Sequence, residues 1–158
     1  MKKIFLALTL ILSLLLCGCS NNSKNSNIQK EEKKVKEDKW GITLTLQDVT
    51  KEGATLVIAQ KDGEFEGELQ TGEDFYIEKN VEGKWEPCNT NPLIDYAWRM
   101  IAYKINKNGI TELKLEWKWL YGELEEGKYR LNKRIMDFIE TGNYTEKTYS
   151  VEFEIKGD

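Results

Sequence analysis

The sequence has no histidine among its 158 residues, and it has only 2 prolines and 3 cysteines. Histidine is the commonest general base and the commonest metal ligand, and Ser/His and Cys/His nucleophile pairs both require it. Its absence removes most catalytic mechanisms, so we expect no enzymatic activity and no cofactor. The cysteines are Cys17, Cys19 and Cys88. Because the first two lie near the N-terminus, the folded domain has one cysteine and cannot contain a disulfide of its own.

Basic residues are fewer than acidic ones. The chain has 23 lysines and arginines against 27 aspartates and glutamates, which gives a net charge of -4. A nucleic-acid interface needs a clustered basic face, so we expect no nucleic-acid partner. Hydrophobic residues make up 40% of the chain and aromatic residues 11%, which is enough for one globular domain with its own core.

One long apolar run is present, in residues 4–16. Lys2 and Lys3 precede it, and a basic segment followed by an apolar one is typical of an export signal. The run is too short to be a comfortable membrane span. We therefore predict that residues 1–18 are a signal peptide that is removed.

The signal ends in the letters LCGCS, which resemble the lipobox of bacterial lipoproteins. Leu16 lies three residues before Cys19 and the small Gly18 lies directly before it, whereas Cys17 departs from the usual choices. The resemblance implies transfer of a diacylglyceryl group to the Cys19 thiol, cleavage before it, and anchoring to the outer face of the cell membrane. Two acyl chains suffice for stable anchoring. The alternative, an ordinary secretory signal, would leave Cys19 as a free thiol.

Residues 19–39 follow the signal and are mostly polar. Between residues 20 and 39 only Ile28 and Val35 are apolar, so this segment cannot bury enough surface to offset its ordering entropy. We predict that it is a flexible tether behind the lipidated cysteine. The folded domain then occupies residues 40–158.

The first half of residues 111–131 alternates strictly between apolar and charged residues. The apolar positions are Leu113, Leu115, Trp117 and Trp119. This spacing predicts a half-buried strand with all four side chains in the core.

The second half of this segment has the pattern Leu124-x-x-Gly127-x-Tyr129. It predicts a turn that places a tyrosine at the start of the next strand, where its hydroxyl bonds back onto the turn. This is the tyrosine-corner arrangement of Greek-key sandwiches. We expect Trp117, Trp119 and Tyr129 to contribute most to the core.

Other segments of alternating or apolar residues between turns predict further strands. They are residues 42–46, 54–60, 75–81, 84–88, 102–105, 129–138 and 147–155. The glycine-rich and acidic residues 61–74 predict a long loop or a loosely paired edge. Between residues 89 and 105 we expect a turn and then a strand, although the strand count there stays open. About seven or eight short strands at this spacing are typical of an immunoglobulin-like sandwich.

The succession TLTLQDVT, GATLVI, FYIEKNVEGKW and EWKWLYGELEEGKYRLNKRIMDF also resembles a bacterial immunoglobulin-like domain family of Gram-positive envelope lipoproteins. The resemblance covers residues 42–155 and is most specific in WLYG and in the letters around Tyr129. It implies an all-β, immunoglobulin-like Greek-key β-sandwich with no catalytic residues to carry over and no defined ligand. Antibody-type domains have a bridging cysteine two residues after the corner tyrosine, where this chain has Leu131.

Four aromatic residues stand at predicted turns or strand ends, where recognition residues are often found. They are Trp85, Tyr96, Trp98 and Tyr121. They form a candidate patch for a ligand or a partner. The alternative is that they cap the ends of the core.

Two further candidates are weaker. Asp62, Glu64 and Glu66, with the acidic residues that follow them, offer oxygen ligands for calcium, but they lack a recognised loop spacing and also fit a solvated edge. Cys88 is either a small buried hydrophobe or a thiol for intermolecular bridging.

These observations favour a non-catalytic, membrane-anchored lipoprotein, most simply a monomer, that presents one domain for contact with an envelope protein or the cell wall. The alternative is a receptor for a small molecule or a glycan that uses the loop aromatic residues. A passive spacer also stays open.

Overall fold

The computed structural model describes residues 38–157. The predicted signal peptide, Cys19 and almost all of the predicted tether lie outside this range. Within it, no helix is long and apolar enough to cross a membrane.

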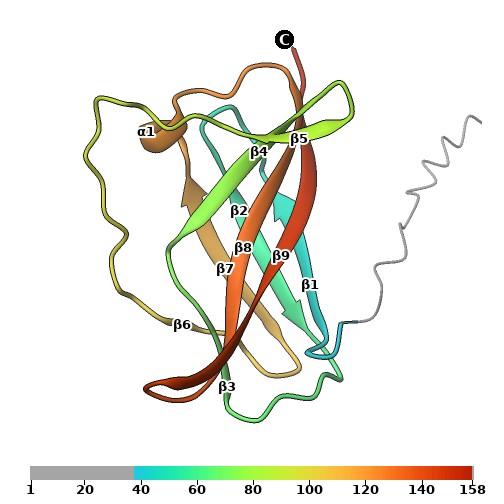
Figure 1. Ribbon diagram of the computed structural model, residues 1–158. Helices are drawn as coiled ribbons and strands as arrows, with labels where there is room; N and C mark the ends of the chain where they lie inside the picture. The colour runs from blue at the N-terminus through green and yellow to red at the C-terminus, as the bar shows by residue number, and fades with distance from the viewer. Residues whose placement is uncertain (1–37, 158) are drawn as a thin grey trace, which may run out of the picture. The chain divides into compact units, whose positions relative to one another are not determined.

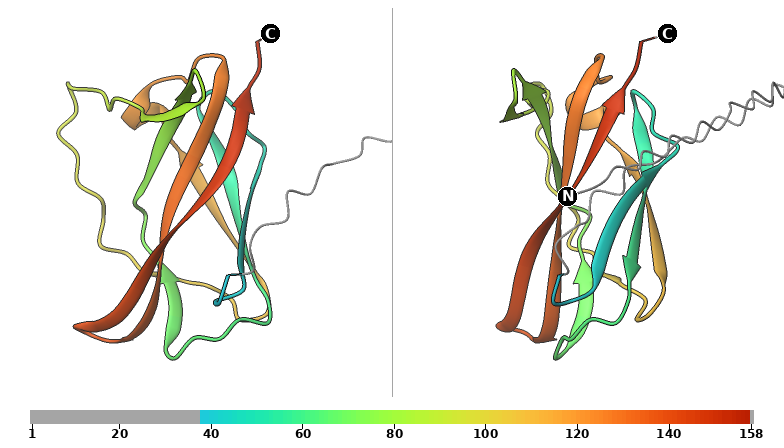
Figure 2. Two further views of the ribbon diagram at one scale, coloured as in Figure 1. Left: turned by 45° about the vertical axis from the view of Figure 1, so that its right-hand side comes forward. Right: turned by 90° about the vertical axis from the view of Figure 1, so that its right-hand side faces the viewer.

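The described chain forms two antiparallel sheets that pack face to face, as Figures 1 and 2 show. The elements are β1 (Ile42–Gln47), β2 (Gly53–Gln60), β3 (Glu68–Thr71), β4 (Phe75–Val81), β5 (Lys84–Pro87), β6 (Tyr103–Lys104), β7 (Ile110–Glu116), α1 (Lys118–Tyr121), β8 (Gly127–Glu140) and β9 (Asn143–Ile155). The smaller sheet has the order β1-β2-β7. The larger has the order β5-β4-β8-β3-β6, and β9 also pairs with β8. The predicted all-β sandwich is confirmed.

Local turn chemistry explains the β4–β5 hairpin. Glu82 and Gly83 connect the strands with φ values of 51° and 87°. Positive φ at both central residues is the requirement of a type I′ turn, which matches the twist of the paired strands. The hairpin predicted at these two residues is therefore confirmed.

Strand β8 organises the larger sheet. It pairs with β9 along its length, and on its other side it pairs first with β4 and then with β3. Residues 72–74 interrupt this second side between β3 and β4. The prediction that residues 61–74 lack a well-paired strand is wrong at β3, where the alternating Leu69 and Thr71 are buried and the strand pairs with both β8 and β6.

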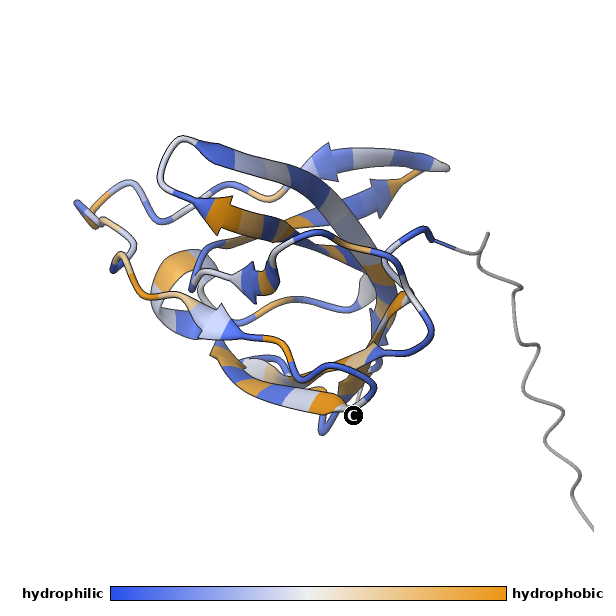
Figure 3. Ribbon diagram, turned by 90° about the horizontal axis from the view of Figure 1, so that it is seen from below, coloured by the Kyte–Doolittle hydropathy of each residue, from blue (hydrophilic) through white to orange (hydrophobic). Residues whose placement is uncertain are grey.

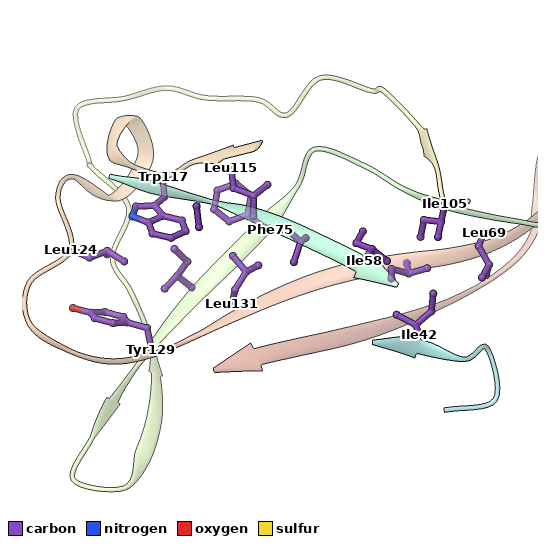
Figure 4. Packing of buried hydrophobic residues seen from close by; sticks show 14 of the residues in the cluster. Ile42, Ile58, Leu69, Phe75, Ile105, Leu115, Trp117, Leu124, Tyr129 and Leu131 are labelled. Atoms are coloured by element: carbon purple, nitrogen blue, oxygen red, sulfur yellow. The ribbon is translucent and has the colours of Figure 1, made fainter. Parts of the chain in front are cut away.

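The core lies between the two sheets (Figure 4). Hydrophobic and hydrophilic residues alternate along several strands, as Figure 3 shows, so each strand gives one face to this core. Trp117 is fully buried. Its ring stacks on Phe153 at 5.4 Å, and its Nε1 donates to the Lys51 carbonyl at 2.9 Å. Burial of the indole therefore leaves no unpaired donor.

Tyr129 lies at the start of β8 and is also buried. Its hydroxyl donates to the carbonyl of Glu125 at 2.9 Å, which ties the β8 strand to the turn before it. Leu124 is buried beside this turn. Gly127 has a φ of 151°, a backbone conformation that favours glycine. This is the geometry of a tyrosine corner.

The prediction that Trp119 belongs to the core is wrong. Strand β7 ends at Glu116, and Trp117 has helical backbone angles that begin the single turn α1. In a helical turn, residues three apart share a face, so Leu120 follows Trp117 into the core and is fully buried. Trp119 points outward with an exposed fraction of 40%.

We predict that Trp117→Ala lowers the free energy of unfolding by about 3–5 kcal/mol, because it removes a buried aromatic ring and leaves a cavity. Trp119→Ala is the matched control, and it should cost less than about 1 kcal/mol because the side chain is partly exposed. Urea denaturation monitored by circular dichroism measures both. Equal losses for the two variants would contradict this placement of the two indoles.

Candidate functional site

The connection between β5 and β6 is the longest irregular segment of the described chain, and it bows outward on the side of the molecule where β7 lies (Figure 1). It comprises residues 88–102. The amide of Asn91 donates to the carbonyl of Leu120 in α1 at 2.8 Å, and the Asn91 side chain accepts a bond from the Leu93 amide at 3.0 Å. The first bond attaches the connection to α1, and the second fixes the turn within the connection.

Three aromatic rings, which we call the aromatic cluster, join the connection to α1. They belong to Tyr96, Trp98 and Trp119. Tyr96 lies 5.9 Å from each of the two indoles, and the indoles are 5.5 Å apart, all with edge-to-face geometry. Trp98 also lies 5.2 Å from the buried ring of Phe75. The rings therefore form a continuous path from the core to the surface.

Several large apolar side chains of the connection are exposed, and they lie within a few residues of Tyr96 or Trp98 in the sequence. Leu93 has an exposed fraction of 91%, Met100 is fully exposed, and Ile101 is exposed to a lesser degree. Tyr96 and Trp119 add further exposed aromatic surface. Apolar groups gathered on one segment, rather than scattered singly, are typical of interaction sites.

The sequence-predicted patch is assembled only in part. Tyr96 and Trp98 are in contact. Tyr121 lies closer to the core, with its ring centre 6.4 Å from that of Phe75. The Tyr121 hydroxyl accepts a bond from the Ile77 amide at 3.4 Å, and burial raises its pKa to about 12. Tyr121 is thus linked to the cluster through Phe75, which contacts both Tyr121 and Trp98.

Trp85 stands apart from the other predicted patch residues. It lies on β5, where the Arg130 guanidinium is 4.8 Å from its ring centre. The site gains Trp119 instead, which sequence periodicity assigned to the core. Gly122 is the signal in the sequence that could have identified Trp119. A glycine often follows the end of a helix, so Gly122 indicates that a helical turn precedes it and that the strand has ended before Trp119.

A groove of about 650 Å³ adjoins two rings of the aromatic cluster, Trp98 and Trp119. Residues 112–116 of β7 line it, and so do residues 97–99 of the connection. The rest of the lining comes from Gly72, Glu73, Phe75, Tyr103, Trp119 and Lys133. Its volume is within the range of ligand-binding clefts.

An ion pair holds the outer wall of the groove. The guanidinium of Arg99 donates from Nε to Glu73 at 2.9 Å and makes a second contact through Nη2. The Tyr103 hydroxyl donates to the same carboxylate at 3.1 Å. The hydrogen bond from Arg99 keeps the pKa of Glu73 below its ordinary value. The pair joins the connection to the turn between β3 and β4.

Lys133 from β8 lies inside the groove wall and is fully buried. Its ammonium donates to the carbonyls of Gly72 at 2.6 Å and Asp74 at 2.8 Å. These carbonyls are free for this role because residues 72–74 interrupt the pairing of β3 and β4 with β8. Burial lowers the pKa of Lys133 to about 8, since the charged form loses hydration.

Comparison with known families assigns this architecture. The sequence profile of a family described as bacterial Ig-like domain matches residues 38–154. The chain belongs to this bacterial Ig-like domain family. No curated protein and no solved structure matches the chain. Ig-like domains are in general non-catalytic modules for binding or interaction.

This Ig-like domain has no intersheet disulfide in the described residues. Leu131 occupies the position of the second bridging cysteine and is fully buried in the core. Cys88 is half-buried with a free thiol, and burial raises its pKa. A raised thiol pKa lowers the fraction of reactive thiolate, so the geometry favours a packing role for Cys88.

The acidic segment of the Ig-like domain does not form a metal centre. In residues 38–157 no three Asp, Glu, Cys or His residues are placed to share an ion, so Asp62, Glu64 and Glu66 are not gathered for calcium. The nearby backbone is held instead by Asp137, whose carboxylate accepts the amides of Glu66 at 2.9 Å and Gly67 at 2.7 Å. Sequence reasoning missed Asp137, which lies far away in the chain.

We predict that the stability of the Ig-like domain rises between pH 8 and pH 10 through Lys133. The folded-state pKa of about 8 lies below the unfolded value of 10.5, so in this interval the unfolded chain binds more protons and raising the pH favours folding. The full effect is about 3 kcal/mol. Lys133→Met should lose this rise, as measured by urea denaturation at several pH values.

Lys128→Met is the matched control, because Lys128 is an exposed lysine of the same strand. It should keep the pH dependence of the original protein. Parallel stability curves for Lys133→Met and the original protein would contradict the assignment.

Proposed function

We propose that this protein is a lipoprotein anchored through Cys19 to the outer face of a Gram-positive cell membrane, where its single Ig-like domain contacts another envelope protein or the cell wall without catalysis. The support for anchoring is the LCGCS motif after an export signal, followed by a polar tether. Cys19 itself lies outside the described residues.

The observation that carries the contact function is the aromatic cluster with its exposed apolar neighbours. Tryptophan, tyrosine and methionine are enriched in protein interfaces, and the chain exposes all three types on the connection and α1. Trp98 packs on Phe75, and Tyr96 and Trp119 pack on Trp98 and on each other, so little side-chain entropy is lost when a partner covers these rings. A binding surface of this kind needs no catalytic group.

The groove favours a second candidate function. Trp98 and Trp119 both line this concave space, and indole rings stack on the apolar faces of sugars and other small molecules. A receptor for a glycan or a small molecule would use the same residues.

A glycosidase would need a carboxylic acid with a raised pKa to protonate the leaving group. Among residues 38–157, every carboxyl group with a shifted pKa has a lowered one, so none of them supports that role.

We predict that Tyr96→Ala with Trp119→Ala weakens binding to the natural partner at least tenfold without unfolding the domain. Residues 20–158 would be immobilised and titrated with fractionated envelope protein and, separately, with purified cell-wall glycan. Trp85→Ala is the control, since it removes an aromatic ring outside the cluster. Equal binding by all three proteins would contradict a role for the cluster, and the fraction that binds separates the two candidate functions.

We also predict that Cys19→Ser prevents lipid attachment, because the serine hydroxyl cannot replace the thiol that accepts the diacylglyceryl group. The unchanged protein should incorporate labelled palmitate in an expressing Gram-positive cell and partition into the detergent phase. The Cys19→Ser variant should do neither. Cys17→Ser is the control and should behave as the unchanged protein does.

A further inference from the structure

Strand β7 has a free edge that faces the groove. It pairs with β2 on one side only. The backbone N–H of Gln60 donates to the Gly109 carbonyl at 3.0 Å, and the backbone N–H of Trp117 donates to the Glu52 carbonyl at 2.9 Å. Because bonding to one neighbour alternates along an antiparallel strand, the odd-numbered residues between 109 and 117 bond to β2.

The even-numbered residues of β7 therefore turn their backbone N–H and C=O groups away from β2. At the start of the strand, the Ile110 carbonyl on this edge accepts a bond from the side chain of Asn106 at 2.7 Å. Further along, no backbone group in residues 38–157 pairs with Glu112, Lys114 or Glu116 on this edge. An unpaired edge without a bulge or a proline is a template for another strand.

The groove runs along this same edge. All five residues from 112 to 116 line it, although alternate side chains of a strand point to opposite faces. A cavity that lay on one face of β7 would meet only every second side chain. The lining therefore indicates that the groove follows the edge, where the free backbone groups are.

We propose that the groove binds an extended peptide segment of a partner protein, which adds to the smaller sheet as a strand next to β7. This inference rests on the proposed contact function and names the form of its partner. Added strands gain affinity from main-chain hydrogen bonds and specificity from alternate side chains.

The side chains of β7 define the sequence of that segment. On the outer face Glu112, Lys114 and Glu116 are exposed and alternate in charge, so they favour a cation, an anion and a cation at the three facing positions. On the inner face Leu113 and Leu115 favour apolar residues between those charges. The preferred pattern is therefore basic, apolar, acidic, apolar, basic.

The far wall of the groove favours a single peptide over a second copy of this chain. Residues 97–99 are fixed opposite β7 by the ion pair of Arg99 with Glu73. A second copy would bring β2 and its own connection along with its β7 strand, so more than one strand would have to enter the groove between the β7 edge and residues 97–99. A single extended segment has no such flanking strands.

The test uses residues 20–158 and a capped peptide of sequence Lys-Val-Glu-Val-Lys, with amide hydrogen exchange followed by NMR. In the free protein, the amides of Glu112, Lys114 and Glu116 should exchange fast, whereas those of Leu113 and Leu115 are protected by β2. Saturating peptide should slow exchange at the first three at least tenfold and leave the other two unchanged. The charge-reversed peptide Glu-Val-Lys-Val-Glu should bind at least tenfold more weakly.

Two variants separate edge pairing from other modes of binding. Lys114→Pro removes a backbone N–H that faces the groove and not β2. It should therefore abolish peptide binding while thermal unfolding stays cooperative. Lys114→Ala keeps this N–H, so the peptide should still slow amide exchange along the edge. If Lys114→Pro does not fold, Lys114→Glu decides instead, because it should reverse the preference at the central position and favour Lys-Val-Lys-Val-Lys.

Three results of the peptide test would overturn the inference, and a fourth with the natural partner would do so as well. The first is peptide binding without protection of Glu112, Lys114 and Glu116. The second is an unchanged preference in Lys114→Glu. The third is protection of these amides already in the free protein. Protection at all protein concentrations would indicate that residues 20–37 cover the edge. Protection at high concentrations only would indicate that a second copy covers it. Loss of partner capture in the aromatic double variant, with capture retained by Lys114→Pro, would leave the proposed function standing while this inference fails.

Discussion

The burial of Trp117 is the constraint on which the rest of the site depends. Its indole stacks on Phe153 and donates to the Lys51 carbonyl, so it joins the two sheets at one end of the core. To reach this position the chain leaves the extended conformation and enters α1. The next inward residue is then Leu120, and Trp119 is directed to the surface. One buried ring thus decides where an exposed one appears.

A second constraint shapes the space next to that exposed ring. The larger sheet is interrupted at residues 72–74, and Lys133 is held there by two backbone carbonyls. Arg99 and Glu73 join this interruption to the long connection. The connection consequently stands off from β7, and a groove remains between them. Packing inside the sandwich and recognition outside it are therefore coupled through the same few side chains.

The family assignment explains the scaffold and leaves its use to the surface. Ig-like sandwiches host many binding functions, and the site is what distinguishes one from another. Here the core is closed by apolar packing without an intersheet disulfide in the described residues, with Leu131 in the bridging position. The features that differ from a plain sandwich are the exposed connection and the unpaired β7 edge, and they adjoin the same groove.

The sequence by itself determined the fold class, because alternation and turn chemistry are local. The hairpin turn at Glu82 and Gly83 and the strand at β2 both follow from residues close in the chain. Only the tertiary structure decided that Trp119 meets Tyr96 while Trp85 pairs with Arg130, and that β7 keeps one edge free. Such contacts join residues far apart in the chain, and a strand's periodicity is the same whether or not a neighbour lies beside it.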